Sequence, residues 1–248
     1  MSLDKKISSW ILDYAKECGI SSLVVGVSGG IDSALTSTLC AMTGIKTIVV
    51  TLPINQKYDQ VERSYNHIEW LKQKFNNITH IEVDLTDAYL NFINLFNESD
   101  DLVKANTKSR LRMVSLYHIS GIHNGIVVGT GNKIEDFCVG FFTKYGDGGV
   151  DISPIGDLTK SEVKNLSIRL GINKEIVDAQ PTDGLWDIDR TDEEQIGASY
   201  DELEQIMKMI ENNDVQNLSK RDSEVMDIFL TLNRKNKHKM LPIPVYKK

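Results

Sequence analysis

The residues best suited to do chemistry lie in a short glycine-rich stretch, VVGVSGGIDSALT, at residues 25–37. Its apolar start is typical of a strand, and residues 28–33 (SGGIDS) combine small groups with two hydroxyls and one carboxylate. Glycines let the backbone approach an anion closely, and hydroxyls and the N–H groups at a helix start can donate to it. A turn of this kind at the carboxyl end of a strand predicts a phosphate-binding loop.

Asp32 needs its own explanation, because a carboxylate beside phosphates repels them unless a divalent cation such as Mg²⁺ lies between. The Walker pattern GxxxxGK[ST] and the GxGxxG fingerprint are both absent from the sequence. The sequence therefore argues against a kinase-like P-loop and against a standard dinucleotide-binding site. The structural alternative is that Asp32 and Ser33 only cap a helix, with the glycines forming the turn.

The elements that must position this loop alternate along the chain. Short runs rich in β-branched residues predict strands at residues 22–27, 46–53, 79–85 and 125–130. Helix-length segments lie between them. Strand and helix in alternation predict an α/β fold, a doubly wound and mostly parallel sheet with helices on both faces.

Three helices have clear sequence signals. Apolar residues at helical spacing predict an opening helix that stops at Gly19, and another apolar stripe runs through residues 58–75. Thr159 and Glu162 form a capping box for a third helix, which ends at Gly171. The polar, acidic region 181–198 is predicted to be either a lid or a plain surface loop.

Composition narrows the class of protein. The 248 residues are 41% apolar and 25% charged, which suits one domain spanning residues 1–248. The net charge of −7 argues against a general nucleic-acid binder. The three cysteines form neither a disulfide framework nor a CxxC pair, and no stretch approaches the roughly 20 apolar residues of a membrane span. We expect a cytoplasmic protein without membrane or nucleic-acid partners.

The SGGIDS stretch resembles the SGGxDS loop of the N-type ATP pyrophosphatases, adenine-nucleotide alpha-hydrolase-like enzymes that cleave ATP to AMP and pyrophosphate while activating a carboxyl or carbonyl oxygen. Residues 127–163, which include GFFTKYGDGG, resemble the long motif block of ammonia-dependent NAD synthetases. Residues 106–113, 181–186, 192–204 and 238–242 follow in the order of that family. The resemblance implies a ligase that amidates deamido-NAD with ammonia through an adenylated intermediate, giving NAD, AMP and pyrophosphate.

The resemblance also implies roles for individual residues. Asp32 and Glu135 align with the Mg²⁺ ligands, and these two acids with Lys160 are the predicted catalytic residues. Asp136 competes with Glu135 for the metal, and the spacing from Thr130 favours Glu135. The predicted ATP contacts are Gly26, Val27, Ser28, Gly29, Gly30, Ile31, Asp32, Ser33, Thr130, Lys160 and Thr182. The predicted deamido-NAD contacts are Arg110, Lys144, Asp151, His238 and Lys239.

Other features follow from the same resemblance. The sequence has no amidase segment, so ammonia is the expected nitrogen donor, and the family's substrate site between two subunits implies a homodimer. Thr51 stands where some relatives carry an arginine. The loop FFTKYGDGG, residues 141–149, is predicted to line a ligand, with Phe141, Phe142 or Tyr145 stacking on a ring; a tight turn with its aromatics in the core is the alternative.

Two competing functions remain open at this point. A tRNA-thiolating ATP pyrophosphatase predicts catalytic cysteines near the loop and a basic RNA face, whereas Cys40 lies along an apolar helix stripe in an acidic chain. A nucleotide sensor that binds ATP without turnover has no need of the pair Asp32 and Glu135. Both alternatives are less favoured than the ligase.

Overall fold

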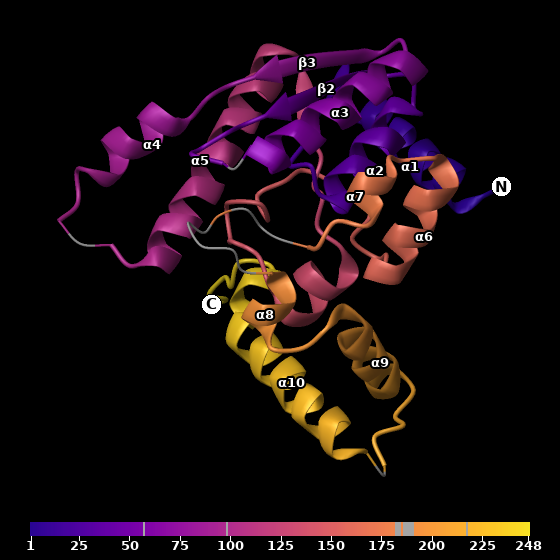
Figure 1. The fold of residues 1–248 in the computed structure, drawn as a ribbon, viewed down its shortest axis with the longest axis vertical. Helices are drawn as coiled ribbons and strands as arrows, with labels where there is room; N and C mark the ends of the chain where they lie inside the picture. Colours follow the sequence, from indigo (N-terminus) through magenta and orange to yellow (C-terminus); the bar gives the residue numbers. More distant parts are fainter. Residues whose placement is uncertain (57, 98, 182–184, 186–190, 217) are drawn as a thin grey trace.

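A parallel sheet forms the centre of the computed structural model, which describes residues 1–56, 58–97, 99–181, 185, 191–216 and 218–248 (Figure 1). In this part of the chain the strand order is β3-β2-β1-β4, and every pair is parallel. A single parallel bridge from Val128 to Ile152 continues the pairing beyond β4. The strands are β1 (Ser22–Gly26), β2 (Lys46–Thr51), β3 (Ile78–Glu82) and β4 (Gly125–Val127).

Helices cover both faces of the sheet (Figure 1). Leu23 and Val25 of β1 pack on one face with α1, α2 and α6. Val24 points to the other face, where it packs with Tyr89 of α4 and Ile119 of α5. The described helices are α1 (Leu3–Glu17), α2 (Ile31–Ala41), α3 (Tyr58–Lys74), α4 (Thr86–Ile93), α5 (Asp101–Ile122), the π-helix η1 (Lys133–Val139), α6 (Lys160–Leu170), α7 (Lys174–Val177), α8 (Asp192–Ile196), α9 (Tyr200–Glu211) and α10 (Lys220–Met240).

The four predicted strands and the parallel arrangement are confirmed, since β1, β2, β3 and β4 lie within or beside the predicted ranges. Each strand ends one to three residues before its predicted carboxyl end. Beyond β4 the pairing is reduced to the bridge of Val128, and Val128, Gly129 and Thr130 line a cavity. The predicted helix ends are confirmed as well. The capping box of Thr159 and Glu162 is complete, and Gly19 and Gly171 adopt φ values of +66° and +77° after their helices.

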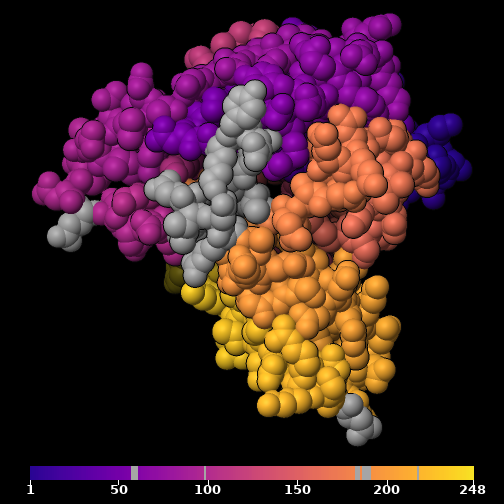
Figure 2. All heavy atoms as spheres, viewed as in Figure 1, coloured from indigo at the N-terminus to yellow at the C-terminus, as the bar shows by residue number. Residues whose placement is uncertain are grey.

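A second apolar cluster joins the last helices to the π-helix. Ile134 and Val139 of η1 pack against Leu203 of α9 and Phe229 of α10. Figure 2 shows these C-terminal helices, coloured orange to yellow, gathered below the region that contains the sheet. The cluster therefore fixes η1, which follows β4 closely, from the side opposite the sheet.

The region 181–198 contains a helix that the sequence analysis did not predict. Helix α8 begins after the capping box of Thr191 and Glu194 and ends at Gly197, whose φ is +88°. Residues 182–184 and 186–190 lie outside the described part of the chain. No described helix is long and apolar enough to cross a membrane.

Candidate active site

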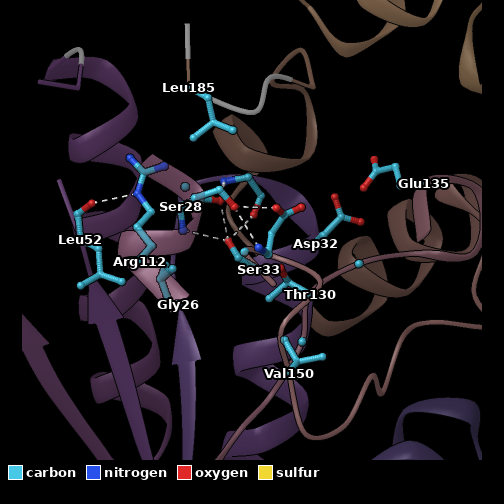
Figure 3. A pocket seen from close by; sticks show the side chains of 18 of the residues that line it. Gly26, Ser28, Asp32, Ser33, Leu52, Arg112, Thr130, Glu135, Val150 and Leu185 are labelled. Atoms are coloured by element: carbon cyan, nitrogen blue, oxygen red, sulfur yellow. Dashed lines mark hydrogen bonds between the residues drawn. The ribbon is translucent and has the colours of Figure 1, made fainter. Parts of the chain in front are cut away.

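The glycine-rich loop lies where β1 ends and α2 begins. Gly29 has a φ of +81°, a conformation that favours glycine. The Ser33 hydroxyl accepts from the Ser28 N–H at 3.2 Å and donates to the Gly30 carbonyl at 2.9 Å, so it closes the turn. The loop opens onto a cavity of about 280 Å³ at the carboxyl ends of β1, β2 and β4 (Figure 3). This is the place that the position of the loop after β1 predicts for a ligand.

Two acids and a lysine from three distant segments meet at one end of this cavity. The Lys160 ammonium lies 2.6 Å from Asp32 Oδ2 and 2.9 Å from Glu135 Oε1. Asp32 is the second residue of α2, Glu135 lies in η1 and Lys160 is the first residue of α6. All three side chains are less than one-fifth exposed. Asp32 and Glu135 thus face a common cation, and Figure 3 shows both beside the loop.

The protonation of this centre follows from its contacts. Burial lowers the pKa of Lys160, but the charges of Asp32 and Glu135 outweigh it, and the net pKa is raised. Burial raises the pKa of Asp32, opposed by Lys160. The pKa of Glu135 is lowered, because Lys160 and the Tyr200 hydroxyl outweigh its burial. Lys160 is therefore a protonated cation held between two acids, the arrangement that buried charges require.

Asn132 and Tyr200 support the centre, and neither was predicted from the sequence. The Asn132 amide donates to Asp32 Oδ1 at 3.2 Å, and its oxygen caps η1 by accepting from the N–H groups of Ile134 and Glu135. The Tyr200 hydroxyl donates to Glu135 Oε1 at 2.5 Å. The only signal for Asn132 was its residue type, which is common at helix N-caps. Tyr200 lies in the stretch 192–204 that resembles the family, but nothing in the sequence pointed to its contact with Glu135.

The choice between the adjacent acids Glu135 and Asp136 has a geometric answer. Both line the cavity, but Glu135 bonds to Lys160 whereas the Asp136 carboxylate lies against the backbone of Gly131. A Cβ at Gly131 would lie 1.8 Å from Asp136 Oδ2, so any other residue there would force the carboxylate to move. Burial, and then the charge of Asp147, raises the pKa of Asp136 well above its usual value. The geometry favours Glu135 as the partner of Asp32.

Known proteins are similar to this sequence over almost its entire length. The family model for NAD synthase matches residues 3–242. An NH(3)-dependent NAD(+) synthetase of Archaeoglobus fulgidus is 36% identical over 97% of this chain and 94% of its own, and one of Methanosarcina acetivorans is 36% identical over 97% and 95%. The chain belongs to the NAD synthase family. The predicted family and the predicted ATP-dependent ligase class are confirmed.

Solved structures agree with this membership. The structure of an NMN synthetase from Francisella tularensis superimposes with a TM-score of 0.87 at 31% identity and covers 99% of this chain and 98% of its own. An NH3-dependent NAD synthetase from Campylobacter jejuni superimposes with a TM-score of 0.81 and covers 99% of this chain and 98% of its own. At 24% identity this likeness supports the fold alone. The predicted doubly wound α/β fold is confirmed.

Most of the ATP contacts predicted for an NAD synthase lie on the cavity wall. Gly26, the loop through Ser33, Thr130 and Lys160 all line it. Thr182 lies outside the described residues. Thr51 is buried away from the cavity, where its hydroxyl lies 3.0 Å from His80 Nε2.

Two arginines that the sequence analysis did not single out reach the cavity from other elements, Arg63 from α3 and Arg112 from α5. The Arg112 Nε–H donates to the Leu52 carbonyl at 3.1 Å, which fixes the guanidinium beside the end of β2 (Figure 3). Cationic groups therefore reach this wall from helices and not from the strand position of Thr51.

The predicted deamido-NAD contacts do not line the cavity. Arg110, Lys144 and His238 form a chain, because Arg110 Nε–H donates to the Lys144 carbonyl at 3.3 Å and the Lys144 ammonium donates to the His238 carbonyl. Lys239 donates to the carbonyls of Gly140 and Phe142, each at 2.7 Å. These four residues gather where α5, the loop 141–149 and the end of α10 meet.

Asp151 belongs to a separate arrangement. Its carboxylate accepts from the Tyr117 hydroxyl at 3.0 Å and from the Val127 N–H at 2.7 Å. It therefore braces α5 against β4 in this structure.

The three aromatic side chains of the loop 141–149 lie in different surroundings. Phe141 lines the cavity, Phe142 lies under the Lys239 ammonium at 5.3 Å, and Tyr145 is 53% exposed. Of the three predicted ring-stacking residues, only Phe141 is placed to meet a ligand in the cavity.

Proposed function

We propose that the reaction of this family, ATP-dependent amidation of deamido-NAD by ammonia, takes place in the cavity at the ends of β1 and β4. The observation that carries the proposal is the convergence of Asp32, Glu135 and Lys160 beside the loop 28–33. An amide cannot form directly from a carboxylate at useful rates, because a carboxylate resists nucleophilic attack. The site must therefore first convert the nicotinate carboxylate into an activated ester.

The chemistry divides into two steps. A carboxylate oxygen of deamido-NAD forms a bond to the α-phosphorus of ATP, and the bond from that phosphorus to the bridging oxygen breaks, which releases pyrophosphate. Ammonia then forms a bond to the carboxyl carbon, and the bond to the AMP oxygen breaks as the nitrogen loses a proton. Negative charge grows on the phosphates during the first step. Oriented N–H donors and cations at that point lower the barrier.

The chain supplies both kinds of group. The backbone and hydroxyls of residues 28–33 form the part of the cavity suited to the pyrophosphate, at the start of α2. The Lys160 ammonium is the cation beside them. A lysine ammonium is a compact point charge on a flexible side chain. It can therefore leave Asp32 and Glu135 and bind the phosphate oxygens as negative charge develops on them.

The residues present also fit Mg²⁺. This ion is usually held by one or two carboxylates together with substrate phosphates, and Asp32 and Glu135 are two carboxylates that already share one cation. In the described part of the chain no group of three or more metal-ligating side chains occurs, which suits a shared ion better than a closed protein site. Bound there, Mg²⁺ would neutralise phosphate charge and help pyrophosphate to leave.

We place deamido-NAD against Arg110, Lys144, Asp151, His238 and Lys239, at the junction of two copies of the chain. Two observations support a homodimer. These residues lie outside the cavity, so a second surface is needed to enclose a ligand against them. Val114, one turn from Arg110 on α5, is 58% exposed, and Leu95 and Phe96 after α4 are 75% and 54% exposed. A contiguous exposed apolar surface marks an interaction site, and these side chains are the candidates for one.

A second candidate substrate is nicotinate mononucleotide, which carries the same carboxylate but lacks the AMP half. The structure described as an NMN synthetase favours it, because it is 31% identical and superimposes closely over the whole chain. Both substrates would be adenylated by the same centre. Selection between them then depends on the residues outside the cavity.

One assay separates these functions. The protein is incubated with ATP, Mg²⁺, ammonium and either pyridine nucleotide, and pyrophosphate and amide product are measured. We expect product with ammonium and a higher kcat/KM for deamido-NAD than for the mononucleotide. The reverse ratio would assign the second function. ATP that binds but stays intact would indicate a sensor and overturn the proposal.

The thiolation alternative predicts a catalytic cysteine near the loop, and none of the three cysteines, Cys18, Cys40 and Cys138, lines the cavity. Cys40 is fully buried, and burial raises its pKa. Burial also raises the pKa of Cys138 to about 11, and the thiolate is the reactive form of a cysteine. A single domain over residues 1–248 and a cytoplasmic location stay predictions.

A further inference from the structure

Helix α9 reaches the catalytic centre through two buried side chains one turn apart. Tyr200, its first residue, is 4% exposed, and Glu204 is 3% exposed. Residues four apart on an α-helix face the same way. The two side chains accordingly point together toward η1 and α6, the elements that carry Glu135 and Lys160.

Tyr200 fixes the orientation of Glu135. Its hydroxyl donates to Glu135 Oε1 at 2.5 Å, and the Lys160 ammonium donates to the same oxygen at 2.9 Å. Neither bond uses Oε2. The Tyr200 ring also lies 4.7 Å from the Lys160 ammonium. Tyr200 is itself fixed, since its backbone N–H donates to the Glu193 carboxylate at 2.8 Å.

Glu204 fixes the start of α6. Its carboxylate accepts from the Ser161 N–H at 2.8 Å and from the Ser161 hydroxyl. Ser161 directly follows Lys160, the first residue of that helix. A lysine at a helix N-terminus faces the positive end of the helix dipole, which is unfavourable. A buried carboxylate at the same turn offsets that field and holds the backbone that carries Lys160.

We infer that Tyr200 and Glu204 are positioning residues for the ligase reaction, which hold Glu135 and Lys160 where both meet Asp32. The inference rests on the proposed function, because it assigns these groups to the adenylation centre. Groups that orient a metal ligand usually change metal affinity or activity by roughly ten- to hundredfold when they are removed. A purely structural α9 would contribute to stability alone.

Tyr200→Phe tests the first contact, because it removes the hydroxyl and keeps the ring. Mn²⁺ serves as the probe ion, and its binding in the presence of α,β-methylene ATP is followed by the loss of the free Mn²⁺ EPR signal. We expect Mn²⁺ affinity and kcat to fall about tenfold. The control is Ile206→Val, which loosens the apolar packing of the same helix without any polar contact and should leave Mn²⁺ affinity within about twofold of wild type.

Glu204→Gln tests the second contact, because the amide keeps the shape but has only one acceptor oxygen. We expect kcat to fall about tenfold while the KM for the pyridine nucleotide is unchanged. The double variant should lose less than the product of the two single effects, since both act on the same Glu135 and Lys160 pair.

The possible results separate failure of the positioning role from failure of the proposed function. Mn²⁺ affinity and kcat that match wild type in Tyr200→Phe, or losses in Ile206→Val as large as in Tyr200→Phe, would overturn the positioning role. A wild-type protein that neither binds Mn²⁺ with the ATP analogue nor forms amide would overturn the proposed function itself.

Discussion

The two halves of the predicted site differ in how far a single chain completes them. At the predicted ATP end, Asp32 and Glu135 each form an ion pair with Lys160, and the three residues come from separate elements that meet at one cavity. At the other end, Arg110 and His238 are exposed, and the Lys144 and Lys239 ammonium groups bond to backbone carbonyls outside the cavity. This difference fits our proposal that each chain activates ATP by itself, while deamido-NAD binds against a second copy of the chain.

The largest effect should come from breaking the ATP end. Asp32→Asn removes one of the two charges that face Lys160, so we expect kcat to fall roughly a thousandfold. The amide keeps the volume of the side chain and can still accept a bond from Lys160. The melting temperature should consequently change by only a few degrees. Rates of NAD formation and melting temperatures measured together provide the test, and equal losses of stability and activity would contradict the catalytic role.

Arg110→Ala tests the other end. The guanidinium is exposed and donates only one bond, to the Lys144 carbonyl, among the described contacts. We expect the KM for deamido-NAD to rise roughly ten- to hundredfold, the usual cost of losing a charged hydrogen bond. The KM for ATP should stay within about twofold, because Arg110 does not line the cavity. Steady-state kinetics with each substrate varied in turn would show a larger change for ATP if the division into two ends were wrong.

Asp151→Ala tests whether Asp151 stabilises the fold in addition to its predicted contact with the substrate. Both carboxylate oxygens are committed to Tyr117 and Val127, and Val127 is fully buried. We expect a loss of about 2 kcal/mol in the free energy of unfolding, measured with urea. Asp151→Asn should recover most of it, because the amide can accept from the Val127 N–H and donate to Tyr117. Unchanged stability in the alanine variant would show that these bonds contribute little.

The smallest effect concerns the packing of α3 on α2, where His67 Nε2 lies 3.0 Å from the Ser37 hydroxyl. Burial lowers the pKa of His67 to about 4 from 6.5, so the unfolded chain binds more protons than the folded chain between these pH values. Stability should therefore rise with pH across this window and be lost as the pH falls through it. We expect a loss of about 1 kcal/mol between pH 7 and 5.5. Urea titrations of His67→Gln should show a flatter pH dependence, and an unchanged slope would exclude His67 as its source.

The sequence predicted the local features of the site better than its long-range contacts. The loop 28–33 could be read directly because its glycines, hydroxyls and strand–helix context are adjacent in the chain. Lys160 looked like an exposed residue in a capping box, and only the resemblance to a family gave it a role. Its bonds to Asp32 and Glu135 join residues far apart in the sequence.

Other residues had no individual sequence signal, although Tyr200 and Arg112 lie in stretches that resemble the family, residues 192–204 and 106–113. Tyr200 stands at the start of an ordinary amphipathic helix, and Arg63 and Arg112 are single charges on helices that pack beside the cavity. Helix α8 was missed because its residues are mostly acidic and its apolar contact is provided by the distant α10 cluster. Such features depend on which helices meet, and periodicity within one segment does not contain that information.

The central claim is that this cavity transfers AMP from ATP to a carboxylate oxygen with the help of Asp32 and Glu135. The most direct test uses deamido-NAD labelled with ¹⁸O in its nicotinate carboxylate, followed by mass spectrometry of the AMP released with ammonium present. The account predicts that AMP carries one ¹⁸O atom in the wild-type reaction and that Asp32→Asn yields almost no labelled AMP over the same time. Unlabelled AMP formed together with NAD by the wild-type protein would contradict it.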